Sequence, residues 1–163
     1  RSPSRGLGDV YKRQGLLLYG VTPTNETSAI ELQPVLSWRS EVIYFKVVEA
    51  GNPVSYGGTW APRNSTRVVT LPVGYADGYR RAFSNQAQVI INDNRHNVVG
   101  RVCMDQTMID IGNTSAFNGD QAVLIGSSGA HQITVQDLAR WSDTIPYEIL
   151  TAITARVPRR WHP

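Results

Sequence analysis

The sequence predicts a mainly β domain, a closed antiparallel barrel or a sandwich-like arrangement, with two short helices. Three observations predict it. Six short runs rich in β-branched and apolar residues follow one another, turn-forming residues separate them, and helical periodicity appears only near the carboxyl end. Such spacing is typical of antiparallel domains in which tight turns join neighbouring strands.

An additional apolar run precedes these six. The segment GLLLYG at 15–20 is closed by glycine and followed by polar residues, so we expect a buried strand and then a loop. The six main strands are expected at 42–48, 66–73, 88–91, 97–104, 108–111 and 122–125. Turns are expected at 51–53, 92–94, 119–120 and 126–129.

Two helices are expected after the strands. Thr134 can cap the first helix, since Asp137 stands three residues later as in a capping box, and Trp141 continues an apolar stripe. The second helix is expected from Pro146 to Ile153, because proline is tolerated in a first helical turn and apolar residues follow at helical spacing.

Composition indicates a folded domain with one core. Hydrophobic residues make up 41% and charged residues 18% of the 163 residues. The longest apolar run is far shorter than the roughly 20 residues that a bilayer crossing needs, so no membrane partner is expected.

The excess positive charge is confined to residues 1–14. That segment has four basic residues and one acidic residue, which accounts for the whole net charge of +3. The rest of the chain is balanced and lacks a basic patch, so no nucleic-acid partner is expected. Because residues 1–14 also lack an apolar period, we interpret them as a non-native or disordered tail.

Cysteine and histidine content argues against a disulfide or a metal centre. Cys103 is the only cysteine, which favours a reducing compartment and hence the cytoplasm. His96, His131 and His162 are scattered without ligand spacing, so we interpret them as surface or turn residues and expect no metal.

Three tyrosines lie in segments that are candidates for chemistry. Tyr56 stands in VSYGGTW, Tyr75 in LPVGYADGYRR and Tyr147 in TIPYEI. A phenol beside glycine at a strand end is open to a ligand or to another backbone. From spacing alone, aromatic packing at a turn is the favoured interpretation of each of them.

Four segments resemble a known family. VSYGGTW, TLPVGYADGYRR, VVGRVCMDQTMIDI and TIPYEILTAITARVPR are similar, in this order and spacing, to signature segments of the carboxy-terminal β domain of alanine racemases. GLLLYG resembles the last strand of the family's (β/α)₈ barrel, which binds pyridoxal 5'-phosphate. The resemblance implies a barrel remnant at 15–30 and the racemase β domain at 31–163, without the family's cofactor-binding lysine.

The resemblance implies a two-base racemisation of alanine. Pyridoxal phosphate accepts the electrons of Cα, a barrel lysine serves one face of that carbon, and a tyrosine matched by Tyr56 serves the other. Met104 matches the residue whose backbone N–H holds the substrate carboxylate, and Cys103 and Asp105 shape the same substrate-binding loop. Tyr75 matches a tyrosine that lines the substrate entrance.

Further matches concern the cofactor and the entrance. Tyr147 matches a tyrosine that binds the cofactor phosphate, and Gly15 and Leu16 match backbone donors to that phosphate. Arg81, Arg101 and Ile145 match residues of the entrance. Arg13, within the tail, and Lys46, on an expected strand, are given no role.

The implied protein is a cytoplasmic, bacterial homodimer that shares its active sites between subunits and supplies D-alanine for peptidoglycan. Because the cofactor lysine is missing, the chain is expected to be inactive alone. Two alternatives remain open: a racemase for serine or for several amino acids, and a non-catalytic β module for binding or dimerisation.

Overall fold

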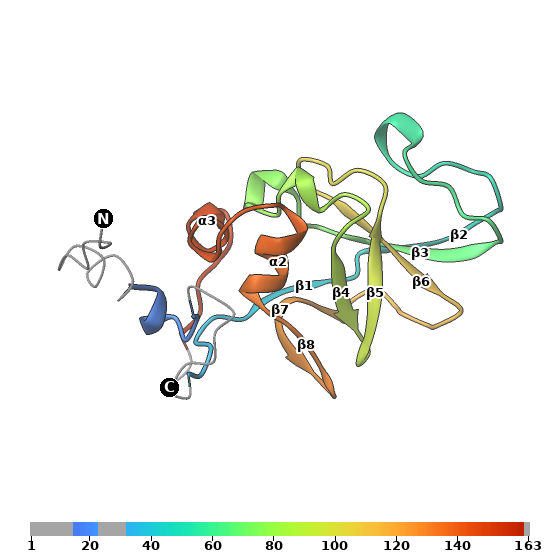
Figure 1. Cartoon of the computed structure of the whole chain (residues 1–163). Coiled ribbons are helices and arrows are strands. Elements are labelled where there is room, and N and C mark those ends of the chain that lie inside the picture. The colour runs from blue at the N-terminus through green and yellow to red at the C-terminus, as the bar shows by residue number, and fades with distance from the viewer. Residues whose placement is uncertain (1–14, 23–31, 162–163) are drawn as a thin grey trace, which may run out of the picture.

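The computed structural model describes residues 15–22 and 32–161, and it places eight strands in one antiparallel sheet (Figure 1). Their order is β1-β7-β4-β5-β6-β3-β2, and β8 pairs with β7 beside this path. The strands are β1 (Trp38–Glu41), β2 (Tyr44–Val48), β3 (Thr66–Leu71), β4 (Gln88–Ile91), β5 (Asn94–Val99), β6 (Thr107–Gly112), β7 (Gln121–Ser128) and β8 (His131–Ile133). The mainly β, antiparallel prediction is confirmed. The predictions for residues 1–14, 23–30 and His162 lie outside the described residues.

The sheet is curled but not closed. β1 and β2 stand at opposite ends of the strand order, yet only Val42 and Ile43 separate them in the chain. The Val42 N–H donates to the Asp120 carbonyl at 2.9 Å, and the Ile43 N–H donates to the Thr70 carbonyl at 3.0 Å. The two edges of the sheet therefore approach each other at this corner, although the described β1 and β2 form no ladder with each other.

The β4–β5 hairpin follows from its turn residues. Asn92 and Asp93 have φ values of 49° and 59°, so both central residues are left-handed, as a two-residue type I′ hairpin requires. Asparagine and aspartate tolerate this conformation better than other non-glycine residues. The turn predicted here is confirmed, except that Asn94 already belongs to β5.

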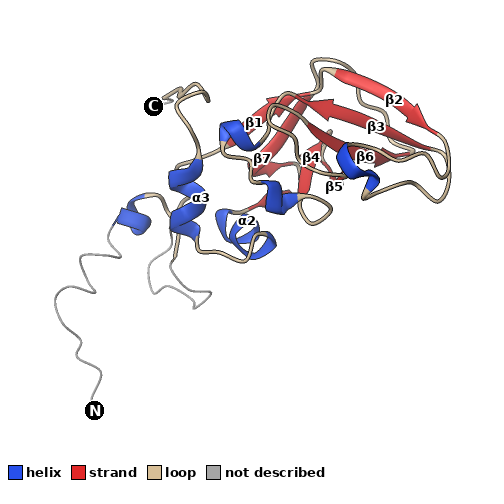
Figure 2. Ribbon diagram, turned by 90° about the horizontal axis from the view of Figure 1, so that it is seen from above, coloured by secondary structure: helices blue, strands red, loops and turns tan. Residues whose placement is uncertain are grey.

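Two α-helices cover one end of the sheet, at the side of β1 and β7 and away from β2 (Figure 2). They are α2 (Val135–Trp141) and α3 (Pro146–Ala152). The capping box at α2 is confirmed: the Asp137 N–H donates to Thr134 Oγ1 at 3.1 Å, and the Thr134 N–H donates to Asp137 Oδ2 at 2.9 Å. Among the described residues, none of the helices has the length and apolarity needed to cross a membrane.

The core consists of one large cluster and one small one. The large cluster joins the sheet to α2 and α3 and includes Leu16 and Tyr79. The small cluster comprises Val48, Val68 and Val99, against which Val54, Trp60 and Met108 pack. This second cluster supports the 49–65 loop, which carries Tyr56.

Several boundaries differ from the sequence predictions. Residues 15–18 form a helical turn instead of a strand, with the Tyr19 N–H donating to the Leu16 carbonyl at 3.0 Å. The hydrophobic periodicity of so short an apolar run does not distinguish a helix from a strand. The strand predicted at 97–104 begins at Asn94 and ends at Val99, because Gly100 has a φ of 70°. The turn predicted at 126–129 is displaced, since β7 continues to Ser128.

His96 is also placed differently from its prediction as a surface or turn residue. Its side chain is buried on β5. Burial lowers the pKa of His96, against the opposing effects of a backbone hydrogen bond at Ile91 and the charge of Asp110. Among the described residues there is no cluster of three metal-ligating side chains.

Tyr79 has a buried hydroxyl without a partner among the described residues. Its ring packs edge-on against Trp38 and tilted against Phe83, and burial raises the pKa of its phenol. An unsatisfied buried hydroxyl costs free energy. Tyr79→Phe should therefore raise the free energy of unfolding of this chain by up to about 1 kcal/mol in urea denaturation. Tyr44 is exposed, so Tyr44→Phe is the control and should leave the free energy of unfolding nearly unchanged. A lower free energy of unfolding for Tyr79→Phe than for the parent would contradict the packing described.

Candidate functional site

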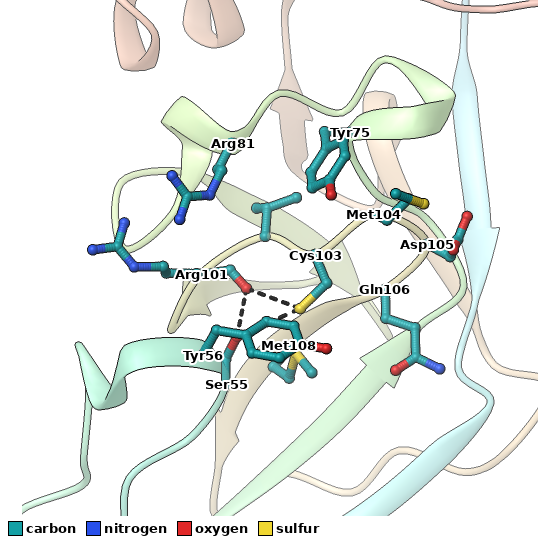
Figure 3. A pocket seen from close by; sticks show the side chains of 11 residues that line it. Ser55, Tyr56, Tyr75, Arg81, Arg101, Cys103, Met104, Asp105, Gln106 and Met108 are labelled. Carbon is teal, nitrogen blue, oxygen red and sulfur yellow. Dashed lines mark hydrogen bonds between the residues drawn. The ribbon is translucent and has the colours of Figure 1, made fainter.

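Seven of the predicted site residues line one open pocket of about 830 Å³ (Figure 3). Three short 3₁₀ helices and the 101–106 loop form its walls: η1 (Tyr56–Gly58), η2 (Tyr75–Asp77) and η3 (Arg81–Phe83). The predicted residues that gather here are Tyr56, Tyr75, Arg81, Arg101, Cys103, Met104 and Asp105. Segments far apart in the sequence therefore converge on one cavity.

Tyr56 is presented by a strained and anchored backbone. Ser55, directly before it, has a φ of 68°, a left-handed value that is uncommon for serine. The Ser55 hydroxyl donates to the Arg101 carbonyl at 2.7 Å. This contact requires glycine at position 100, because a Cβ there would lie only 2.7 Å from Ser55 Cβ. The Tyr56 side chain is left 75% exposed at the pocket, available to a ligand or to another chain.

The 101–106 loop is held through its carbonyl groups. The Tyr75 N–H donates to the Cys103 carbonyl and the Ala76 N–H to the Met104 carbonyl, each at 3.0 Å. Gly74 lies so close that a Cβ there would be 2.2 Å from the Cys103 carbonyl oxygen. The Met104 N–H, in contrast, has no hydrogen-bond acceptor within the described parts of the chain. It is a free backbone donor beside the pocket.

The charges of the pocket favour an anion. Neither Arg81 nor Arg101 has a carboxylate within 4.0 Å in the described structure. Asp105 is neutralised by an ion pair with Arg156. Two unpaired guanidinium groups and a free N–H suit a small carboxylate, because arginine and backbone donors bind such groups directly.

Four other predicted site residues lie elsewhere. Gly15, Leu16, Ile145 and Tyr147 do not line the pocket. The Leu16 side chain is buried in the large cluster, and Tyr147 on α3 packs against the same cluster. Residues 15–18 lie beside α3 in both views, at the end of the domain opposite η1 (Figures 1 and 2). Ile145, predicted at the entrance with Arg81 and Arg101, is exposed directly before α3.

Some pocket residues were missed by the sequence reasoning. Ser55, Val102, Gln106 and Met108 also line the cavity, and Arg156 binds its rim. Ser55 and Gln106 stand directly beside predicted residues, which is the signal that could have found them. Arg156 lies in the segment TIPYEILTAITARVPR, but nothing in the sequence relates it to the pocket, because its contacts are distant in sequence. Lys46 is exposed on β2 and does not line the pocket.

Comparisons with known proteins agree on one family. Residues 35–161 match the family model described as alanine racemase, C-terminal domain. An alanine racemase of Halothermothrix orenii is 44% identical over 151 residues, which are 91% of this chain and 40% of that protein. The chain thus spans about 40% of the length of this curated relative.

Solved structures show the same likeness. The crystal structure of alanine racemase from E. faecalis has a TM-score of 0.86 and 34% identity, covering 90% of this chain and 40% of that one. The alanine racemase from Bartonella henselae, described with covalently bound pyridoxal phosphate, has a TM-score of 0.80 and 30% identity, covering 87% and 39%.

Proposed function

Because this chain belongs to the alanine racemase family, we propose that it supplies one half of the acid–base machinery for pyridoxal-phosphate-dependent interconversion of L- and D-alanine. The observation that carries the proposal is one pocket that combines an exposed phenol, a free Met104 N–H and two unpaired arginines. These are the groups that moving a Cα proton and holding a small carboxylate require.

Each group has a distinct task in the proposed reaction. The Tyr56 hydroxyl removes or returns the Cα proton on one face of the substrate. The Met104 N–H donates a hydrogen bond to the substrate carboxylate and thereby fixes the position of Cα relative to the phenol. Arg81 and Arg101 attract the carboxylate, and Tyr75 narrows the approach so that a small side chain is preferred.

The cofactor would accept the electron pair that Cα releases, which lowers the energy needed to remove the proton. Tyr147 and the backbone amides of Gly15 and Leu16 are proposed to hold its phosphate. The fit is partial: residues 15–18 lie beside α3, the helix that carries Tyr147 (Figures 1 and 2), but Lys46, the only lysine in the described residues, is on β2 outside the pocket. The proposal therefore requires a lysine outside the described residues to hold the cofactor covalently.

The two groups of site residues support a shared active site. Tyr56 on η1 and Tyr147 on α3 lie at opposite ends of the domain (Figures 1 and 2). Tyr147 does not line the pocket that Tyr56 lines. We therefore propose a homodimer in which each active site takes Tyr56 from one subunit and Tyr147 from the other.

Two alternatives predict different results. A serine or broad-specificity racemase would use the same proton chemistry with a different entrance, and a panel of amino acids distinguishes it. A non-catalytic module would bind without reaction.

Supply of D-alanine for peptidoglycan is the proposed role of the reaction.

The test is a reconstituted enzyme, made by joining the amino-terminal part of the Halothermothrix orenii relative to residues 15–163 of this chain. With pyridoxal phosphate it should racemise L- and D-alanine and prefer alanine to serine. The chain alone should show neither racemisation nor the visible absorbance of a covalently attached cofactor. A folded, cofactor-loaded chimera that fails to racemise any amino acid would contradict the proposal.

A further inference from the structure

Arg156 joins two carboxylates that belong to different walls of the pocket. Its Nε lies 3.3 Å from Asp77 Oδ1, and its Nη2 lies 2.6 Å from Asp105 Oδ1. Asp77 ends η2, the 3₁₀ helix that begins with Tyr75, whereas Asp105 stands at the tip of the 101–106 loop. One guanidinium therefore connects the Tyr75 wall to the loop that offers the Met104 N–H.

The Asp77 end of this connection is rigid. Asp77 Oδ2 accepts a hydrogen bond from the Gly74 N–H at 2.9 Å, in a buried setting. The Thr154 N–H donates to the Asp77 carbonyl at 3.1 Å, and Thr154 Oγ1 donates to the Ala76 carbonyl at 3.0 Å. The chain just before Arg156 is thus fixed to η2 by hydrogen bonds that do not involve the guanidinium.

The Asp105 end depends on Arg156. The Asp105 side chain is about half exposed, and Arg156 is its only hydrogen-bonding or ion-pairing partner among the described residues. Without the guanidinium, Asp77 and Asp105 would both be left as uncompensated negative charges, and Asp105 directly follows the residue that offers the Met104 N–H. A carboxylate approaching that N–H would be repelled, because like charges at short range are unfavourable even near solvent.

We propose that Arg156 is a positioning residue that sets the affinity of the pocket for the substrate carboxylate without touching the substrate. It holds the tip of the 101–106 loop through Asp105 and cancels the charge next to the Met104 N–H. This inference rests on the proposed function in assigning the carboxylate to Met104. It adds a residue of the last signature segment to the control of substrate binding.

The test uses Arg156→Gln, Arg156→Lys and the double variant Arg156→Gln with Asp105→Asn in the reconstituted enzyme. Arg156→Gln should raise KM for alanine roughly fivefold, the scale of a partly exposed charge interaction, and leave kcat within about twofold. Arg156→Lys should fall between this variant and the parent. The KM of the double variant should lie between those of Arg156→Gln and the parent, because the double variant removes one of the two unbalanced charges.

A second readout does not need activity. Hydrogen–deuterium exchange of the peptide that spans 103–107 should be faster in Arg156→Gln than in the parent. Arg140→Gln is the matched control, since Arg140 is an exposed arginine paired with Asp137 on α2, away from the pocket. It should change neither KM nor exchange at 103–107.

Three results would overturn the inference. They are an unchanged KM with unchanged exchange, a loss of kcat at constant KM, and a double variant no better than Arg156→Gln. If Arg156→Gln does not fold, Arg156→Lys decides by the same two readouts. Failure of the parent chimera to racemise alanine would instead contradict the proposed function, and the exchange measurement would still decide whether Arg156 holds the loop.

Discussion

The Tyr56→Phe variant of the reconstituted enzyme is expected to racemise alanine on the order of 10³-fold more slowly than the parent, the usual contribution of a positioned acid–base group. The change removes one oxygen from a side chain that is 75% exposed, so folding should be unaffected. The phenyl ring keeps the shape of the pocket. The loss should therefore appear in kcat rather than in KM, as measured by conversion of each enantiomer.

Tyr44→Phe is the matched control for this variant. Tyr44 is another exposed tyrosine, on β2, and it does not line the Tyr56 pocket. Its variant should retain the parent rate within about twofold, in line with an exposed substitution that touches no reacting group. Equal losses in the two variants would contradict a special role for Tyr56.

The second large effect is expected at Gly74. A Cβ added there would lie 2.2 Å from the Cys103 carbonyl oxygen and 2.4 Å from that of Met104. Backbone atoms cannot rotate away as a flexible side chain can, so either the 101–106 loop or the Tyr75 turn must move. Gly74→Ala should cost about 3 kcal/mol, a fall in Tm on the order of 10 °C, measured by thermal denaturation of this chain. In the reconstituted enzyme it should also raise KM, because the Met104 N–H moves.

Gly51→Ala separates packing from backbone strain. Gly51 has a φ of 79°, and nothing lies within 4 Å of its added Cβ. Gly51→Ala should therefore lose only the free energy needed to hold alanine at a left-handed φ, about 1 kcal/mol. Gly74 has a φ of −154°, so Gly74→Ala meets only the clash. A smaller loss for Gly74→Ala than for Gly51→Ala would contradict the close approach at the loop.

Local signals explain which elements could be predicted. The start of α2 depends on neighbouring residues, and the Thr134–Asp137 capping box forms as expected. The β4–β5 turn likewise depends on Asn92 and Asp93 alone. β1 was not predicted, because only its pairing with β7, eighty or more residues later, makes this short segment a strand. β8 was missed for a related reason: it is only three residues long, and its pairing with β7 is what makes it a strand.

The candidate site was predictable as a set of residues but not as an arrangement. The family resemblance named Tyr56, Met104 and Tyr147 without stating their mutual positions. The fold brings the first two to one pocket and leaves Tyr147 on α3, outside that pocket. Arg156 and the left-handed Ser55 could not be found in the same way, since their importance comes from contacts with Asp105 and Arg101 that are distant in sequence.

The most direct test of a Tyr56 role is exchange of the Cα proton with deuterated solvent, followed separately for L- and D-alanine by NMR in the reconstituted Tyr56→Phe enzyme. If Tyr56 serves one face and a lysine of the complete protein serves the other, one enantiomer should still exchange its Cα proton without racemising, and the other should not exchange. Parent-like exchange of both enantiomers, with racemisation at the parent rate, would show that Tyr56 is not the acid–base group.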